Sequence, residues 1–155
     1  MLVELPRLRH KALKFVNPVL ERSIRAQYGN YQQEVDNQGS LTETFVRIEL
    51  TSDDPDWQGV PIILTTGKSM DRKKTAVKVT MKDGSVIEFD EEDLIRTKDF
   101  VSDAYERVFT EAIESRHNIF TSSDEVLESW RILEPIRSRW SMDDSIAKYT
   151  TASSV

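Results

Sequence analysis

The chain of 155 residues carries 27 acidic and 21 basic side chains, for a formal net charge of −6, and it contains no cysteine. The length favours one domain, the acidic balance argues against a nucleic-acid-binding protein, and the missing cysteines exclude disulfides, thiolate metal sites and cysteine nucleophiles. His10 and His117 are too few for a histidine-rich metal site, so we expect no bound metal. No apolar run approaches the roughly 20 residues that a membrane span needs, so we expect a cytoplasmic protein without membrane contact.

Residues 1–38 are predicted to start as a helix and then to become irregular. The expected helical stripe comprises Leu2, Leu5, Leu8, Leu13 and Val16. Asn17-Pro18 should end this helix, because the residue before a proline disfavours helical backbone. Residues 19–24 favour a second short helix, and the polar stretch 29–40 is typical of a loop.

Residues 39–90 form the predicted β zone. Strands are expected at 41–50, 60–65, 76–82 and 85–89. Residues 60–64 are apolar on both faces of a strand, which indicates a central position in the sheet. Asp83-Gly84 lies between two alternating runs, and such a pair is a strong hairpin signal. The pattern predicts an antiparallel sheet.

Residues 91–150 form the predicted helical zone, with helices at 101–114 and 123–134, and the tail 151–155 is expected to be disordered. Ser122 and Glu125 have the spacing of a capping box, and Pro135 should end or kink the second helix. Strands followed by helices predict an α+β domain. Two helices can cover only one face of the sheet, so the other face, including Phe45, should meet a partner.

Five cations follow the apolar strand at 60–65, although the chain as a whole is acidic. They are Lys68, Arg72, Lys73, Lys74 and Lys78, and with Asp71 they give a local net charge of +4. Lysines at the end of a strand, beside free backbone N–H groups, can bind a phosphate. They can equally be solvated charges that protect a sheet edge. The residue pattern leaves both interpretations open, and no G-x-G-x-x-G, P-loop or G-x-S-x-G motif supplies a self-sufficient active site.

Four stretches carry a more specific signal. In chain order they are RAQYGNY (25–31), SLTETFVRIEL (40–50), DWQGVPIILTTGK (56–68) and DAYERVFTEAIESRHNIFTSSDEVLESWRILEPI (103–136). Together they resemble the C-terminal α+β part of the glucose-6-phosphate dehydrogenase family, which carries a large, mostly antiparallel sheet and the dimer interface. The resemblance implies the same fold with a reduced antiparallel sheet and helices packed on one face, because the segment between Met81 and Asp103 is shorter than in the family.

The resemblance also implies roles for particular residues. Lys68 and Lys73 match positions that contact the sugar phosphate, and Lys74 falls where some members reach a second, structural NADP. Thr65 stands where the family usually has arginine, which argues against that structural site. The substrate implied is glucose 6-phosphate, the family's cofactor is NADP, and the setting is the pentose phosphate pathway.

The family's dinucleotide-binding domain, with its catalytic histidine, has no counterpart in residues 1–155. Hydride transfer needs a bound cofactor and a base, so we assign no catalytic residue and expect this part to be inactive alone. It should work as a homodimer or with a separate cofactor-domain chain. The alternative is a non-catalytic module, derived from that domain, that binds a sugar phosphate or a protein.

Overall fold

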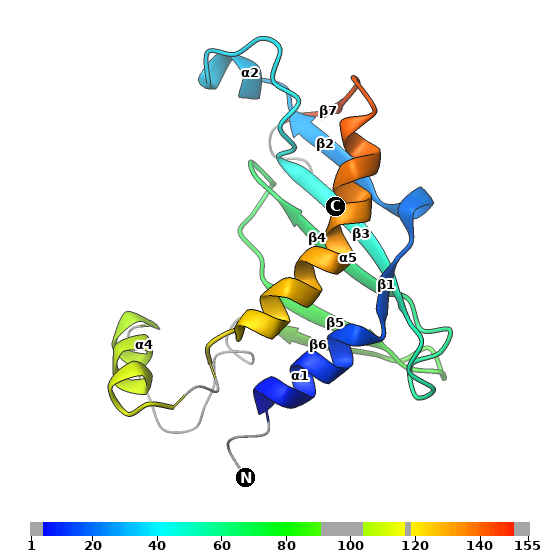
Figure 1. Ribbon diagram of the computed structural model, residues 1–155. Coiled ribbons are helices and arrows are strands. Elements are labelled where there is room, and N and C mark those ends of the chain that lie inside the picture. The colour runs from blue at the N-terminus through cyan, green and yellow to red at the C-terminus, as the bar shows by residue number, and fades with distance from the viewer. Residues whose placement is uncertain (1–4, 91–103, 117–118, 151–155) are drawn as a thin grey trace.

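The computed structural model describes residues 5–90, 104–116 and 119–150 (Figure 1). The helices are α1 (Leu5–Lys14), α2 (Tyr31–Glu34), α4 (Ala104–Ile113) and α5 (Ser123–Ser141), with a 3-10 turn η1 (Leu20–Arg22). The strands are β1 (Val16–Pro18), β2 (Ile24–Tyr28), β3 (Phe45–Ser52), β4 (Ile62–Gly67), β5 (Ala76–Thr80), β6 (Val86–Asp90) and β7 (Ala147–Tyr149). The expected α+β class is confirmed. The predicted tail at 151–155 lies outside the described residues.

The main sheet has five strands and is organised around β3. On one edge β3 pairs antiparallel with β4, from Phe45 opposite Gly67 to Leu50 opposite Ile62. On its other edge β1 pairs with the C-terminal half of β3 and β2 with the N-terminal half, both antiparallel. β7 then joins β2 in parallel. The sheet is therefore mostly antiparallel, with one parallel pair at its edge.

The core lies between the sheet and α5. Ile48 and Leu50 of β3 pack with Ile132 and Ile136 of α5, and Ile136 is only 1% exposed. Burying each such side chain contributes roughly 1.5–3 kcal/mol, so these contacts fix α5 on one face of the sheet. Figure 1 shows α5 crossing the strands with α1 beside its first turns. Of the two helices expected on one face, the one predicted at 123–134 lies there as α5, and α1 packs beside it.

A partly buried ion pair joins α1 to the start of α5. Arg9 donates to Glu125 through Nε (2.5 Å) and to the carbonyl of Phe120 (2.8 Å). Glu125 also accepts from the backbone N–H of Ser122, whose hydroxyl accepts in return from the Glu125 N–H, so the predicted capping box is confirmed. These contacts lower the pKa of Glu125 from 4.5 to about 2, chiefly through the Arg9 hydrogen bond. The charge of Glu125 thus holds two helices together.

The predicted Asp83-Gly84 hairpin is also confirmed. β5 and β6 pair antiparallel as a separate two-stranded sheet, and Gly84 has the positive φ (85°) that the turn requires. One face of this hairpin is entirely apolar, and its four side chains are about two-fifths exposed or more: Val77 46%, Val79 38%, Ile87 45% and Phe89 42%. An isolated two-stranded hairpin is only marginally stable in water, and packing against a partner would stabilise it. This exposed apolar face is available for such packing.

Two sequence-based expectations at the N-terminal side were wrong, and one strand was not predicted. Residues 19–24 form the turn η1 and the start of β2 instead of a second short helix, and α2 interrupts the expected loop 29–40. The sequence did not predict the strand β2, because its Gln27 is polar although it is 0% exposed. The Gln27 amide donates to the carbonyls of Ser40 and Thr42, and these bonds satisfy a buried polar group in a way that no local pattern reveals.

Two further expectations were wrong in the β and helical zones. Residues 60–64 are not central in the sheet that the structure describes: among the described strands β4 pairs with β3 alone, and its Ile63 and Leu64 are about half exposed. Of the two outcomes expected at Pro135, an end or a kink of the helix, the end is wrong, because α5 continues to Ser141. Ile132 and Ile136 lie on either side of Pro135 and both pack into the core, so tertiary packing offsets the lost helical hydrogen bond.

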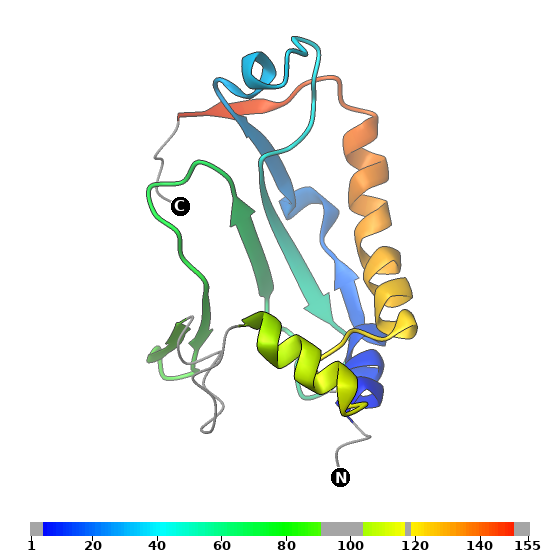
Figure 2. The same cartoon turned by 90° about the vertical axis from the view of Figure 1, so that its left-hand side faces the viewer.

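α4 does not cover the sheet as the expected helix 101–114 should. It lies to one side of the layer formed by α5 and the sheet (Figures 1 and 2). Its apolar side chains are largely exposed, with Tyr105 at 73%, Phe109 at 65% and Ile113 at 83%. No described helix combines the length and apolar character that crossing a membrane requires.

Candidate functional site

The end of β4 is shaped by a glycine and a left-handed residue. A Cβ atom on Gly67 would lie 2.7 Å from the sulfur of Met70 and 2.9 Å from Cδ2 of Phe45, so a larger residue would force these two side chains to move. The chain then bends at Ser69, whose φ of 51° is uncommon for a residue with a side chain. This tight bend places Lys68 between the last strand residue and the turn.

The backbone of Lys68 is held on both sides. Its N–H donates to the carbonyl of Thr44 (2.8 Å), and its own carbonyl accepts from the hydroxyl of Tyr149 (2.6 Å). Thr44 directly precedes β3 and Tyr149 belongs to β7, so the main sheet fixes the point from which the Lys68 side chain leaves. That side chain is exposed, and across the described ranges its ammonium has no hydrogen-bond or ion-pair partner.

Lys74 and Lys78 have a different environment. Both ammonium groups contact Glu88 of β6, at 2.6 and 3.3 Å. The pair lowers the pKa of the Glu88 carboxyl, with the Lys74 hydrogen bond as the largest cause. These two cations are therefore partly neutralised by the hairpin, as the interpretation of solvated charges at a sheet edge predicts.

The five predicted cations thus do not form one cluster. Figure 2 shows the connector 68–75 running from the end of β4 back along the sheet to the hairpin near its opposite end. Lys68 stands at the first end of this connector and Lys74 at the second, whereas Arg72 and Lys73 lie between them and are exposed. Any shared ligand would be contacted first from the fixed end, at Lys68.

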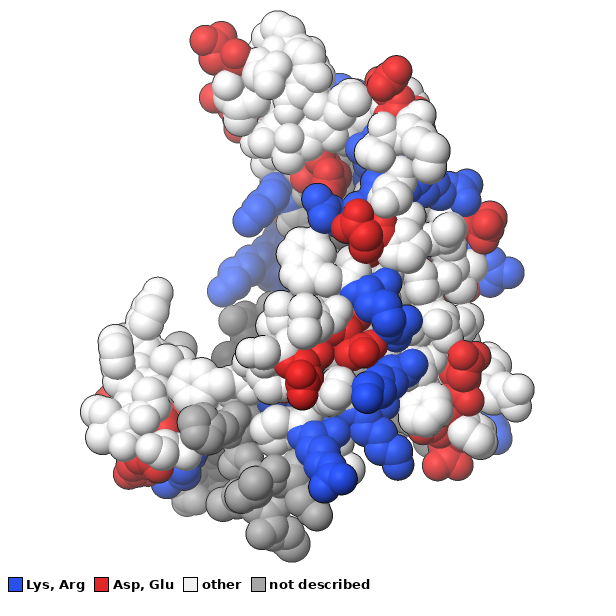
Figure 3. Space-filling model, in the orientation of Figure 1, with Lys and Arg blue, Asp and Glu red and all other residues white. Residues whose placement is uncertain are grey.

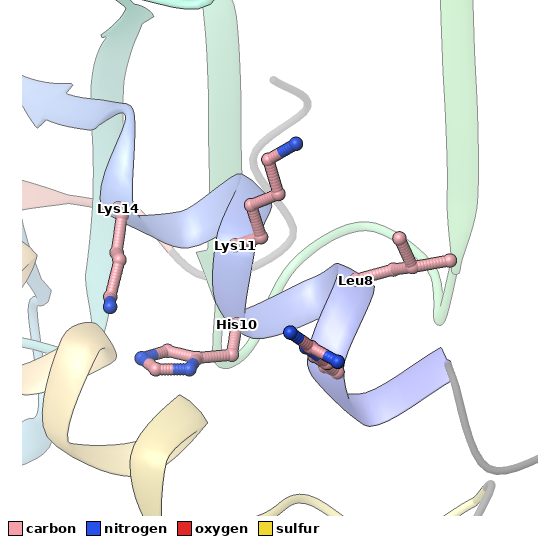
Figure 4. A pocket seen from close by; sticks show the side chains of 5 residues that line it. Leu8, His10, Lys11 and Lys14 are labelled. Atoms are coloured by element: carbon pink, nitrogen blue, oxygen red, sulfur yellow. The ribbon is translucent and has the colours of Figure 1, made fainter.

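A second basic region lies along α1. Figure 3 shows basic side chains gathered over this helix. Arg7, His10, Lys11 and Lys14 line an open hollow of about 450 Å³ together with Leu8. In Figure 4, Lys11 points away from His10 and Lys14, so these side chains do not converge on one point. His10 lies 3.9 Å from Asp124 at the start of α5. We interpret this region as a solvated helix face, because its side chains do not form a defined binding site.

Sequence reasoning missed the residues that surround Lys68 and Lys74. Tyr149 and Thr44 position the Lys68 backbone, and Glu88 pairs with Lys74. β7 has only three residues, Ala147 to Tyr149, which is too short to show an alternating pattern. The residues that the structure describes include no group of three or more His, Asp or Glu side chains able to hold a metal ion.

Comparison with known proteins identifies the fold and the family. The family described as "Glucose-6-phosphate dehydrogenase, C-terminal domain" matches residues 6–101 and 84–154. A glucose-6-phosphate 1-dehydrogenase of Chlamydia muridarum is 28% identical over 195 aligned residues, which cover 89% of this chain and 38% of that protein. This alignment is longer than the 155-residue chain, so the relative carries segments with no counterpart here, in agreement with a reduced sheet.

Two solved structures share the fold. A glucose-6-phosphate dehydrogenase "in complex with its substrate glucose-6-phosphate" superposes with a TM-score of 0.74 at 18% identity, over 97% of this chain and 42% of that one. The enzyme from Mycobacterium avium gives a TM-score of 0.71 at 19% identity, over 98% and 41%. The chain therefore spans about two-fifths of the length of the proteins that it matches.

Proposed function

The chain belongs to the glucose-6-phosphate dehydrogenase C-terminal domain family, and we propose that it forms the sugar-phosphate-binding side of such an enzyme. In this proposal Lys68 and Lys73 contact the phosphate of glucose 6-phosphate. The observation that carries it is Lys68: a fixed backbone, an exposed side chain and an ammonium that no described residue neutralises. A cation without a partner, delivered from a rigid strand end, binds an anion with little loss of entropy.

The connector 68–75 determines how the second cation takes part. Lys73 lies between Lys68 and Lys74 in the connector, so in this proposal it approaches the phosphate from the connector side of the site. Lys74 would have to leave Glu88, at 2.6 Å, before it could bind a nucleotide. We therefore keep a structural NADP contact at Lys74 as the weakest part of the proposal, also because Thr65 replaces the family's usual arginine.

The oxidation step needs components beyond this site. Hydride transfer requires NADP held against C1 of the sugar and a base that accepts the C1 hydroxyl proton. In the described part of the chain the one histidine, His10, lies on α1 beside Asp124. We propose that NADP and the base come from a cofactor-binding domain or a separate chain, and that residues 1–155 have no dehydrogenase activity alone.

A second candidate function, a protein-interaction module, is favoured by the apolar hairpin face. Val77, Val79, Ile87 and Phe89 are exposed together on one side of β5 and β6. Such a face suits a homodimer or a cofactor-domain partner. The two candidates differ in one respect: only the first requires the connector to bind a phosphorylated sugar.

The test is an NMR titration of the isolated chain with glucose 6-phosphate and, separately, with glucose. Two partly desolvated charge-assisted contacts of about 1.5–3 kcal/mol each support a Kd on the order of millimolar. We expect shifts confined to residues 65–75 that require the phosphate and weaken with salt. Absence of any shift with either sugar would leave the interaction module as the better account. Turnover of glucose 6-phosphate with NADP that Lys68→Ala abolishes would show that the chain is active alone.

A further inference from the structure

Tyr149 connects the C-terminal strand to the proposed phosphate-binding lysine. Its hydroxyl lies 2.6 Å from the carbonyl oxygen of Lys68, 3.0 Å from Oγ1 of Thr44 and 3.2 Å from the carbonyl of Thr44. A tyrosine hydroxyl has one proton to donate. The shortest of these contacts is the one to Lys68, and the Thr44 carbonyl already accepts from the Lys68 N–H. The Tyr149 proton is therefore assigned to the Lys68 carbonyl.

This assignment defines a continuous hydrogen-bond chain. The backbone N–H of Tyr28 donates to Oγ1 of Thr44 (2.9 Å), the Thr44 hydroxyl donates to the Tyr149 oxygen, and Tyr149 donates to Lys68. Tyr28 and Thr44 are both 8% exposed, so the chain begins inside the sheet. Hydrogen bonds in such a series strengthen one another, because each donor is polarised by the bond that it accepts.

The ring of Tyr149 is also held. It lies edge-on to Phe45 and Tyr28, with centroid distances of 6.0 and 6.3 Å. The parallel pairing of β7 with β2 and the bond from the Gly29 N–H to the Tyr149 carbonyl (2.9 Å) fix its backbone. Next to Tyr149, the Lys148 ammonium contacts the side-chain oxygen of the fully buried Gln27. The hydroxyl is thus presented from a rigid frame.

The bond to Tyr149 acts at the peptide that joins Lys68 to Ser69. Fixing the Lys68 carbonyl fixes the orientation of this peptide, and Ser69 then adopts its unusual φ of 51°. That peptide sets both the position of the Lys68 side chain and the direction in which the connector 68–75 leaves β4. A residue in β7 therefore controls the geometry of a site on β4.

We propose that Tyr149 is a positioning residue for anion binding: through its bond to the Lys68 carbonyl it holds Lys68 in the orientation that receives the sugar phosphate. This inference rests on the proposed function of Lys68 and goes beyond it by assigning a role to the C-terminal strand. Tyr149 itself does not touch the ligand. Its effect is on the arrangement of Lys68 before the ligand arrives.

The experiment uses the Tyr149→Phe variant, which removes the hydroxyl and keeps the ring. Tyr28→Phe is the matched control, because it deletes a hydroxyl of the same aromatic cluster that bonds to Glu34 at 2.5 Å and not to Lys68. Amide hydrogen exchange without ligand and NMR titration with glucose 6-phosphate are measured on wild type and on both variants. For Tyr149→Phe we expect faster exchange at the Lys68 amide and glucose 6-phosphate binding weakened about threefold to tenfold. Tyr28→Phe should change neither.

A double variant separates positioning from a general structural role. If Tyr149 acts through Lys68, adding Tyr149→Phe to Lys68→Ala causes no further loss of binding. Wild-type binding and Lys68 exchange that Tyr149→Phe leaves unchanged would overturn this inference while the proposed function stands. Faster exchange spread evenly over β2, β3 and β4 would also overturn it, by showing a merely structural role. Wild-type protein that does not bind glucose 6-phosphate would overturn the proposed function and the positioning role together.

Discussion

Two regions of the molecule differ in whether their side chains are buried and paired within the chain. One is the side of the sheet that α5 covers, and the other is the segment from β4 through the β5–β6 hairpin. Under α5, Ile136 is 1% exposed and the Glu125 carboxylate is paired with Arg9. Along the other segment, the apolar face of the hairpin is exposed and Lys68 has no partner among the described residues. The α5 side therefore supplies stability, whereas the β4–hairpin segment exposes the groups that a ligand or partner could contact.

The largest expected effect comes from the core. Ile136→Ala should lower the free energy of unfolding by about 2–5 kcal/mol, because it leaves a cavity among Ile48, Leu50 and Ile132. Ile87→Ala on the exposed hairpin face serves as the control, since Ile87 is already 45% exposed, and it should cost less than about 1 kcal/mol. Urea unfolding of both variants measures the difference. Equal losses would mean that the hairpin belongs to the core, and the comparison would fail.

The next effect concerns acid stability on the α5 side. The folded-state pKa of Glu125, about 2, lies below its ordinary value of 4.5. The stabilisation from its charge is therefore present above pH 4.5 and is lost as the pH falls from about 4.5 toward about 2. Glu125→Gln should reduce stability at pH 7 by about 2 kcal/mol and flatten the pH dependence in this window. Glu21→Gln is the control, because the Glu21 side chain is 74% exposed and its charge should contribute little to stability.

A smaller effect is expected on assembly. If the apolar hairpin face meets a partner, Phe89→Ser should weaken self-association without changing the unfolding midpoint, because Phe89 contributes to an exposed face. Light scattering across a concentration series measures this association. Ile113→Ser on α4, a residue that is 83% exposed, controls for a general loss of surface hydrophobicity. Wild-type protein that stays monomeric at high concentration would count against a homodimer.

The smallest effect is expected at Glu88. Glu88→Gln removes the shared partner of Lys74 and Lys78, whose side chains are 41% and 59% exposed. Exposed ion pairs contribute little to stability, so the thermal midpoint should not change measurably. Release of the two lysines should make phosphate binding slightly tighter at low salt and indistinguishable from wild type at moderate salt. A clear fall in the midpoint would show that the hairpin depends on this pair.

The features that the sequence predicted correctly are those with local causes. The alternation around β3, the Asp83-Gly84 turn and the Ser122–Glu125 capping box are each encoded within a few residues. The strands β1 and β7 were missed because each has only three residues, and β2 was missed because its buried Gln27 is polar. All three are defined by pairing with distant segments. Pro135 misled the prediction of α5, since a local rule was overridden by packing of Ile132 and Ile136.

The candidate site also combines features that local sequence predicts with contacts between distant residues. An apolar strand followed by Gly67 and Lys68 can be recognised from adjacent residues. The hydrogen bond from Tyr149 that holds Lys68 joins residues 81 positions apart, and the pairing of Lys74 with Glu88 depends on the hairpin register. Such contacts arise only when the sheet has formed, so residue patterns alone could not separate the fixed Lys68 from the neutralised Lys74.

The most direct test of the proposed function compares two variants that remove the same charge. Lys68→Gln removes the unpaired cation at the end of β4, and Lys78→Gln removes a cation that is 3.3 Å from Glu88. In parallel NMR titrations with glucose 6-phosphate at moderate salt, we expect Lys68→Gln to weaken binding about tenfold and Lys78→Gln to bind like wild type. Equal weakening in both variants, or none in either, would contradict a specific phosphate contact at Lys68.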